Sequence, residues 1–464
     1  MRLKRVSDVD AFTKIMQEYV DLGEIEGASA RIVHKGKDLY RGCVGCSDVA
    51  TRRPFGFDDI VCIFSLTKMV IGVAALKLWE QGGFRMDDPV SDYIPAFGNA
   101  TVYWPTEKGP VIRPARKPVT IRNLFTMTAG YPYPTVGVKP SMPLHYLSVG
   151  QIVGDAFEKC RREAERTGEA ITTLKAAELL ASTPMCFEPG EGWLYGHCSD
   201  ILGAVVSVIS GKSLADFICQ EITRPLGMVD TGYLLTPEQR TRVATIYDHF
   251  DPDYVKPYDL EAEARDRLLS VPTKEFEICS SSLYSTLDDY SRFIQMLANG
   301  GSLDGVRVLG RKTVELMASD QLTAGQYADF KRDWFPNGNM TWGLLTCVSK
   351  SMNHSDMVRF PGAFGWSGAA GTVAWADPGE NLSITFMTQR FPGDTEPIVS
   401  KLMQIAYSMI RAFGLVFSGA KEREIVIYDE TSDTPASGVF NRCRTACLVR
   451  MHPSVGGGGK PCAV

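Results

Sequence analysis

The sequence has no apolar run that approaches the length of a membrane span, so no membrane partner is expected. Its first residues, Met1 to Asp8, carry charge but lead into no apolar segment, which argues against a secretory signal peptide. Basic residues show no excess either, because the net charge is −5 and Lys and Arg are scattered along the chain. A nucleic-acid surface requires clustered Lys and Arg, so no nucleic-acid partner is expected.

Metal-binding patterns are also scarce. The six histidines show no paired ligand spacing, so the sequence predicts neither a metal nor another cofactor. Twelve cysteines without a secretory signal indicate free thiols in a reducing cytoplasm. Cys43 and Cys46 lie beside an expected hairpin, where zinc or redox chemistry is not expected. Glycines 456–459 follow no strand and open no helix, which argues against a phosphate-binding loop.

The composition is that of a globular protein, with 44% hydrophobic and 22% charged residues, and 464 residues are enough for two lobes with a shared core. A helix over Asp10–Leu22 and two strands around the His34–Lys37 turn predict an α+β architecture. Further helices are expected at Gln151–Arg166, Thr173–Ser182, Ser199–Ile209, Leu214–Ile222, Asp288–Asn299 and Glu396–Phe413, and strands at Trp342–Val348, Gly371–Trp375 and Ser383–Gln389.

These elements predict a discontinuous chain organisation. Residues 1–85 and 270–416 are expected to form an α/β sheet domain, and residues 86–269 a mostly helical lobe inserted into it. Residues 417–464 lack periodicity and are expected to form a poorly ordered appendage. No internal repeat is visible.

Ser65 and Lys68 form a Ser-x-x-Lys pattern at the start of an amphipathic helical run that Gly82-Gly83 ends. Residues three apart share a helix face, so the Lys68 amine can reach the Ser65 hydroxyl. The first turn also offers unpaired N–H groups to an oxyanion. Because Lys68 must be neutral to accept a proton, its pKa has to fall from about 10.4 to about 7, which predicts a buried position in a cleft.

Two later segments supply what such a serine needs. Tyr195-Gly196-His197 lies at a turn just before a helix, and Trp366-Ser367-Gly368-Ala369 lies in a run of small residues at a strand. With Ser65 and Lys68, these segments resemble the three motifs of the class C β-lactamase and penicillin-binding-protein superfamily over about residues 10 to 415. Other segments that look familiar are Met86–Val90, Leu124–Gly130, Leu283–Thr286, Asp288–Tyr290 and Asn299–Gly301.

The resemblance implies a β-lactamase-like fold, an antiparallel sheet flanked by helices with an inserted all-helical lobe. It also implies roles: Ser65 is the acylated nucleophile, Lys68 the proton acceptor and Tyr195 the hydroxyl that relays protons to the leaving group. The backbone N–H groups of Ser65 and Ala369 would form the oxyanion hole. The strand with Trp366, Ser367 and Gly368 would line the cleft and, with His197, bind the substrate.

Two departures from the superfamily pattern bear on the substrate. Trp366 stands where lactamases and peptidases have Lys or His, so the cation for a substrate carboxylate is missing, at a cost of roughly 1.5 to 3 kcal/mol. The same change resembles the family VIII carboxylesterases, which favour short acyl esters. His197 replaces the asparagine of Tyr-x-Asn, which puts amide recognition in doubt and predicts lower activity in acid.

The resemblance therefore predicts a serine hydrolase that cleaves a small carboxylic ester. One alternative is a β-lactamase or D-amino-acid peptidase or amidase, which would need a cation near Trp366 from elsewhere, such as Arg390. Acyl transfer to an alcohol instead of to water is another alternative. A catalytically weak binding or regulatory module with this fold is the third. The sequence leaves the oligomeric state open.

Overall fold

The structure is a computed structural model that describes residues 8–134, 141–251, 254–259, 272–336, 339–351, 359–393, 395–410, 415–417 and 425–427. The chain divides into two units, Met1–Met409 and Ile410–Val464. In the second unit, β19 (Leu415–Phe417) pairs with β20 (Ile425–Ile427) in antiparallel fashion. The rest of the expected appendage, including glycines 456–459, lies outside the described residues.

An eight-stranded antiparallel sheet forms the centre of the first unit, in the order β13-β14-β15-β16-β17-β1-β2-β3. The first and the last strand of this sheet in sequence therefore lie side by side within it, because β1 pairs with β17 in a register that places Ile32 opposite Ile384. The strands are β1 (Gly27–His34), β2 (Lys37–Asp48), β3 (Arg53–Pro54), β13 (Met340–Trp342), β14 (Cys347–Ser349), β15 (Phe364–Ser367), β16 (Val373–Asp377) and β17 (Leu382–Met387).

The first hairpin confirms the two strands expected around the His34–Lys37 turn. Lys35 and Gly36 both have positive φ, of 49° and 75°. Two positive φ values at the centre of a two-residue turn match the right-handed twist of the strands that it joins. The hairpin thus starts the sheet with a local, sequence-encoded turn.

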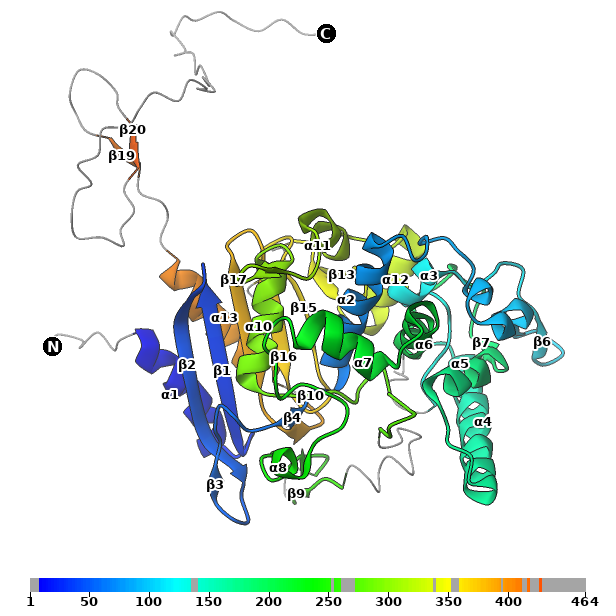
Figure 1. Cartoon of the computed structure of the whole chain (residues 1–464), viewed down its shortest axis with the longest axis horizontal. Helices are drawn as coiled ribbons and strands as arrows, with labels where there is room; N and C mark the ends of the chain where they lie inside the picture. Colours follow the sequence, from blue (N-terminus) through cyan, green and yellow to red (C-terminus); the bar gives the residue numbers. More distant parts are fainter. Residues whose placement is uncertain are drawn as a thin grey trace, which may run out of the picture. The chain divides into compact units, whose positions relative to one another are not determined.

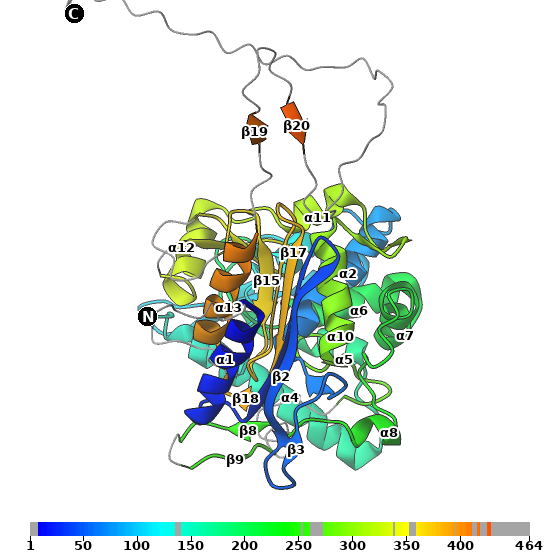
Figure 2. The ribbon, with the colours of Figure 1, turned by 90° about the vertical axis from the view of Figure 1, so that its left-hand side faces the viewer.

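Helices cover both faces of this sheet (Figure 1, Figure 2). On one face, α10 (Leu287–Ala298) packs against β1, β16 and β17, and α2 (Thr67–Glu80) lies beyond it. On the other face, α1 (Asp8–Asp21) and α13 (Glu396–Met409) pack against each other. This arrangement is the predicted α+β class, an antiparallel sheet flanked by helices.

Helix α2 differs from the amphipathic helix that the sequence suggested. Its residues from Thr67 to Leu76 are all buried, so the helix has no polar face there. A helix that is apolar all round belongs to the interior of a protein. Packing of α2 between α6 (Cys198–Ser210) and the rest of the core thus replaces the one-sided burial that was expected.

The inserted segment is mostly helical but also holds a three-stranded sheet in the order β6-β5-β7, which no sequence pattern indicated. Its strands are β5 (Thr101–Trp104), β6 (Val111–Pro114) and β7 (Pro184–Met185), and its helices are α3 (Ile121–Phe125), α4 (His145–Thr167), α5 (Thr173–Ala181), α6, α7 (Leu214–Ile218) and α8 (Pro237–Arg240). Thr120 caps α3, because its side chain accepts a hydrogen bond from the Asn123 N–H. The division into a sheet domain and a lobe remains a prediction, and its boundary at 269/270 lies outside the described residues.

The prediction of one continuous strand at Trp342–Val348 was wrong. The structure has two strands there, β13 and β14, paired in antiparallel fashion. Leu345, at the bend between them, has a positive φ of 54°, and its N–H donates to Phe125 O. A contact with a residue far away in the sequence therefore stabilises the turn at Leu345. The apolar composition of the segment gave no indication of this turn.

The remaining short elements connect these layers. They are β4 (Val61–Cys62), β8 (Tyr247–Asp248), β9 (Lys256–Pro257), β10 (Tyr284–Ser285), β11 (Ser302–Leu303), β12 (Val306–Arg307), β18 (Arg390–Phe391), α11 (Arg311–Met317) and α12 (Ala324–Asp333). Across the described ranges, no single helix is long and apolar enough to cross a membrane. Among the residues that the structure describes, one pair, α6 with the helical segment Leu214–Thr223, reaches that length and composition together, and the two are bent by 78°.

Candidate active site

Ser65 lies in a single 3-10 turn, Phe64–Leu66, that leads directly into α2. Phe64 has a φ of 43°, a left-handed conformation that costs a bulky residue about 1 to 3 kcal/mol. The buried Phe64 ring packs 6.0 Å from the Phe391 ring, so tertiary contacts hold the turn in place. The backbone before Ser65 is therefore sharply bent, and Ser65 itself remains partly exposed while its neighbours are buried.

Lys68 donates a hydrogen bond to Ser65 Oγ at 3.1 Å, as the i, i+3 spacing predicted. Its amine also donates to Ser280 O at 2.7 Å. The Lys68 side chain is only 1% exposed, so water cannot replace these two partners. Nothing in the sequence pointed to Ser280, because its contribution is a main-chain carbonyl from a segment more than two hundred residues away.

Burial lowers the pKa of Lys68 to about 7, and the nearby Asp200 and Cys198 oppose this shift. The direction follows from desolvation, which disfavours a buried ammonium. At neutral pH a large fraction of Lys68 is therefore the free amine. A free amine within hydrogen-bonding distance of a serine hydroxyl can accept its proton.

Tyr195 completes the group, because its ring centroid lies 4.6 Å from Lys68 Nζ. Burial raises the pKa of Tyr195, while hydrogen bonds with Ser65 and Trp366 lower it in part. The phenol therefore keeps its proton at neutral pH and can pass it on. The structure thus brings Ser65, Lys68 and Tyr195 together, and their catalytic roles remain predictions.

Trp366 lies on β15 and is almost fully buried. Its indole Nε1 donates to Tyr195 Oη at 2.8 Å. The ring also packs against Trp342 and Trp334, with centroids 4.8 Å and 5.5 Å away. Trp366 therefore places a buried ring and a hydrogen-bond donor against Tyr195, and its predicted contact with substrate remains a prediction.

The β15–β16 turn is clamped against the Ser65 turn. Thr372 Oγ1 donates to Ile63 O at 3.2 Å, and the Gly368 N–H donates to Thr372 O at 2.7 Å. A Cβ at Gly368 would lie 2.4 Å from Ile63 O, so only glycine permits this approach. Ala369, the predicted oxyanion donor, follows in this turn and is exposed, as is Ser367. The clamp fixes the position of the turn relative to the nucleophile.

His197 is buried and forms the N-terminal boundary of α6. Its Nδ1 lies 2.8 Å from Asp200 Oδ2, and its ring packs against Phe157 and Tyr133. The preceding Gly196 allows close passage of the chain, because a Cβ there would lie 2.0 Å from Tyr131 O. His197 therefore belongs to a buried polar pair, and its expected contact with substrate remains a prediction.

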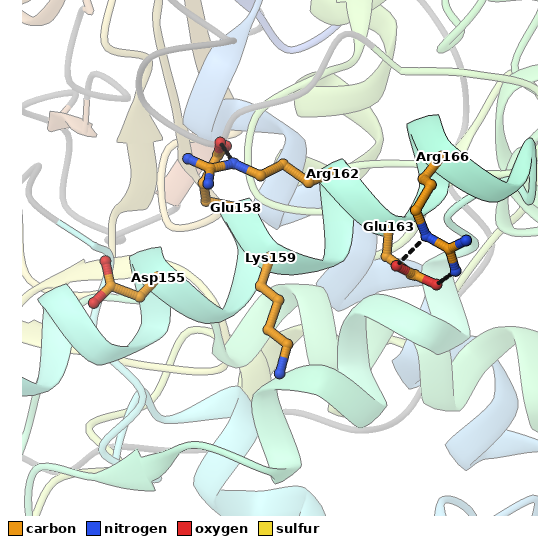
Figure 3. A pocket seen from close by; sticks show the side chains of 6 residues that line it. All are labelled: Asp155, Glu158, Lys159, Arg162, Glu163 and Arg166. Carbon is orange, nitrogen blue, oxygen red and sulfur yellow. Dashed lines mark hydrogen bonds and ion pairs between the residues drawn. The ribbon is translucent and has the colours of Figure 1, made fainter.

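A separate hollow of about 420 Å³ lies along α4 (Figure 3). Three acidic and three basic side chains line it, namely Asp155, Glu158, Lys159, Arg162, Glu163 and Arg166. Arg162 pairs with Glu158 and Arg166 with Glu163, so these charges satisfy one another. None of these six lining residues is a serine, threonine or cysteine. Over the part of the chain that the structure describes, no group of three or more His, Cys, Asp or Glu side chains is arranged to hold a metal ion.

Comparison with known proteins identifies the family. The family model Beta-lactamase matches residues 12–406. The chain is 30% identical over 395 residues to an uncharacterized protein of Mycobacterium tuberculosis, covering 83% of this chain and 91% of that protein. Esterase EstB of Burkholderia gladioli is 26% identical over 405 residues, with 82% of this chain and 91% of EstB covered.

A solved structure supports the same fold. EstCE1, described as a hydrolase with promiscuous acyltransferase activity, superposes with a TM-score of 0.69 at 21% identity, over 86% of this chain and 98% of EstCE1. The chain belongs to the β-lactamase family and has its fold. It is thus a serine hydrolase or acyltransferase, as the resemblance of its motifs implied.

Proposed function

We propose that this enzyme hydrolyses carboxylic esters with short acyl chains through an acyl-enzyme on Ser65. The observation that carries the proposal is the 3.1 Å hydrogen bond between Lys68 Nζ and Ser65 Oγ, made by a buried lysine whose pKa burial lowers to about 7. This pair supplies a nucleophile and a base at neutral pH. Neither a metal nor a cofactor is required for the step.

The proposed reaction has two halves. The free amine of Lys68 takes the Ser65 proton while Ser65 Oγ attacks the ester carbonyl carbon, and the N–H groups of Ser65 and Ala369 hold the oxyanion. Tyr195 passes its phenolic proton to the leaving alkoxide as the bond from that oxygen to the carbonyl carbon breaks, and the Lys68 ammonium returns the proton taken from Ser65 to Tyr195. Water then attacks the acyl-enzyme, its proton returns through Lys68 and Tyr195, and the carboxylic acid leaves with Ser65 regenerated.

Trp366 supports an ester over a β-lactam or a D-amino-acid peptide. A substrate carboxylate would meet an indole whose N–H is already used by Tyr195, at a cost of roughly 1.5 to 3 kcal/mol for the missing charged hydrogen bond. Arg390, the cation that the lactamase or peptidase alternative would need, donates through Nη1 to Pro392 O. EstB, a relative of this chain, is named an esterase, which agrees with a preference for esters.

Acyl transfer to an alcohol is a second candidate. The aromatic rings of Trp334, Trp342 and Trp366 lie within 4.8 to 6.1 Å of one another or of Tyr195. Such a wall disfavours ordered water beside the acyl-enzyme and favours an apolar alcohol as acceptor. EstCE1, a structural relative that is described as having both activities, fits this candidate.

We also propose that the protein works in a reducing compartment such as the cytoplasm. Nine cysteines among the described residues are free thiols. Burial raises the pKa of Cys43 to about 12, which keeps this thiol protonated and unreactive at neutral pH. Fractionation of cells that express the native protein, with Ser65-dependent activity as the marker, tests the compartment.

Hydrolysis of a p-nitrophenyl ester series from acetate to decanoate and of a chromogenic cephalosporin tests the function. We expect turnover that is greatest for short chains, is lost in Ser65→Ala and is weak for the cephalosporin. Ser408→Ala, on the exposed surface of α13, is the matched control and should keep full activity. Strong Ser65-dependent cephalosporin cleavage would favour the lactamase alternative.

Two further outcomes separate the remaining candidates. Added butanol that diverts the acyl group from free acid to butyl ester, measured by mass spectrometry, would favour acyl transfer. No Ser65-dependent turnover of any substrate, together with intact folding by circular dichroism, would contradict the ester proposal and favour a binding module.

A further inference from the structure

Asp200 and His197 form a buried pair in the first turn of α6, beside the predicted catalytic residues. Asp200 Oδ2 lies 2.8 Å from His197 Nδ1, and the two side chains are only 14% and 9% exposed. Within the described residues, Asp200 Oδ1 and His197 Nε2 have no hydrogen-bond partner. The carboxylate therefore has a single hydrogen bond, and it lies in the first turn of α6, where the helix dipole is favourable to acidic side chains.

Tyr133 connects this pair to the lysine. The Tyr133 ring meets His197 edge to face at 4.8 Å, and Lys68 Nζ lies 5.6 Å from the centre of the same ring. Asp200 is the main opposing charge on Lys68, because it acts against the burial that lowers the pKa of that amine. The titratable groups around the pair and the lysine are Lys68, Tyr133, Tyr195, Cys198, Tyr233 and Cys279.

We propose that Asp200 is a positioning residue of the Ser65 site: its carboxylate, held by His197, is a buried counter-charge that sets the balance between the ammonium and the free amine of Lys68. This inference rests on the proposed role of Lys68 as proton acceptor. It also gives His197 a function that differs from the predicted contact with substrate. The histidine holds the carboxylate in place, at the position where the Tyr-x-Asn pattern of the superfamily has an asparagine.

The sign of the effect follows from electrostatics. A negative charge near an amine favours its protonated form, so Asp200 partly offsets the lowering of the Lys68 pKa by burial. Removal of this charge makes the ammonium less favourable and leaves the free amine present at lower pH. Asp200 thus keeps the working range of Lys68 near neutrality.

The test is the pH dependence of Ser65 acylation in Asp200→Asn, from pH 5 to 9. The acylation rate should rise with pH along an acid limb and then reach a plateau. In Asp200→Asn we expect this acid limb to move to lower pH by about one unit. At a pH below the limb, the rate divided by the plateau rate should then be roughly tenfold higher than in the unchanged protein. His197→Phe keeps an aromatic ring at this position but removes the hydrogen bond that holds the carboxylate, so the counter-charge is no longer fixed in place. This variant should move the acid limb in the same direction. It provides the test if Asp200→Asn does not fold.

Two readouts keep this inference distinct from the proposed ester activity. The first is kcat/KM for p-nitrophenyl butyrate, and the second is the rate at which a fluorophosphonate labels Ser65, followed by mass spectrometry. If the fluorophosphonate labels Ser65 but the ester is not turned over, the ester proposal is contradicted. The pH dependence of the labelling rate would still report the acid limb. The matched control is Asp377→Asn, a buried carboxylate on β16 that is not among the charges acting on Lys68. An acid limb that is unchanged, or moved upward, in both Asp200→Asn and His197→Phe would overturn the inference.

Discussion

The indole Nε1 of Trp366 donates a hydrogen bond to Tyr195 Oη at 2.8 Å, and the two rings lie 5.5 Å apart. The bond uses the tyrosine oxygen as acceptor, so the phenolic proton is left to point elsewhere. It also stabilises any negative charge that develops on that oxygen during proton relay. Trp366 thus acts on Tyr195 directly, beyond its effect on substrate choice.

Trp366→Phe should lower kcat for ester hydrolysis by about tenfold while KM changes little. The substitution keeps an apolar ring but removes the indole donor, and one hydrogen bond is worth about 1.4 kcal/mol when its acceptor gains charge in the transition state. Steady-state kinetics with p-nitrophenyl butyrate measure the change. The control is Trp375→Phe, a buried tryptophan on β16 whose ring faces Arg359, and this variant should keep kcat. Equal losses in both variants would assign the effect to packing.

The pH profile of kcat/KM should rise through an acid limb near pH 7. Activity requires the free amine of Lys68, whose pKa burial lowers to about 7, so protonation below that pH removes the base. Initial rates between pH 5 and 9 with a fixed low ester concentration give the limb. A limb below pH 5 in the unchanged protein would assign proton acceptance to a group other than Lys68.

Lys68→Met should abolish acylation and change the pH dependence of stability in a defined direction. Between about pH 7 and 10, unfolded Lys68 binds a proton that folded Lys68 does not, so the unchanged protein gains stability as pH rises, by up to about 1.4 kcal/mol per unit. Lys68→Met lacks this contribution. Urea denaturation at pH 7 and pH 9 should show the unchanged protein gaining about 2 kcal/mol relative to the variant. A constant difference between the two proteins would contradict the lowered pKa.

The sequence predicted the local parts of this structure well, because they depend on short-range spacing. The Ser65 to Lys68 contact follows from one helical turn, and the first hairpin from its Lys35-Gly36 turn. The amphipathic interpretation of α2 failed because this helix is buried on all sides by elements that come much later in the chain. Only the assembled core shows which faces of a helix are covered.

Long-range contacts around the site could not be predicted for the same reason. Ser280 O, which accepts from Lys68, is a backbone atom without a sequence signature. The bond from Trp366 to Tyr195 joins segments 171 residues apart. For Asp200 a signal did exist, because it lies three residues after His197 at the start of a helix, the spacing at which side chains meet.

Gly368→Ala should cost more activity than its single methyl group suggests. Its Cβ would lie 2.2 Å from Thr372 Oγ1 and 2.4 Å from Ile63 O, so the β15–β16 turn must move away from the Ser65 turn. Such overpacking costs about 1 to 3 kcal/mol, and displacement of the Ala369 N–H weakens the proposed oxyanion hole. We expect kcat/KM to fall at least tenfold and the melting temperature to drop by a few degrees.

The control for this change is Gly98→Ala, where the nearest atom to the new Cβ is Ser91 Cβ at 3.9 Å. It adds the same methyl group in open space, so activity and melting temperature should stay close to those of the unchanged protein. Thr372→Val removes the hydrogen bond to Ile63 O without a clash, and a partial loss of kcat is expected because the clamp is weakened rather than forced open. Full activity in Gly368→Ala would mean that the turn tolerates displacement, and that the second oxyanion donor is a group other than Ala369.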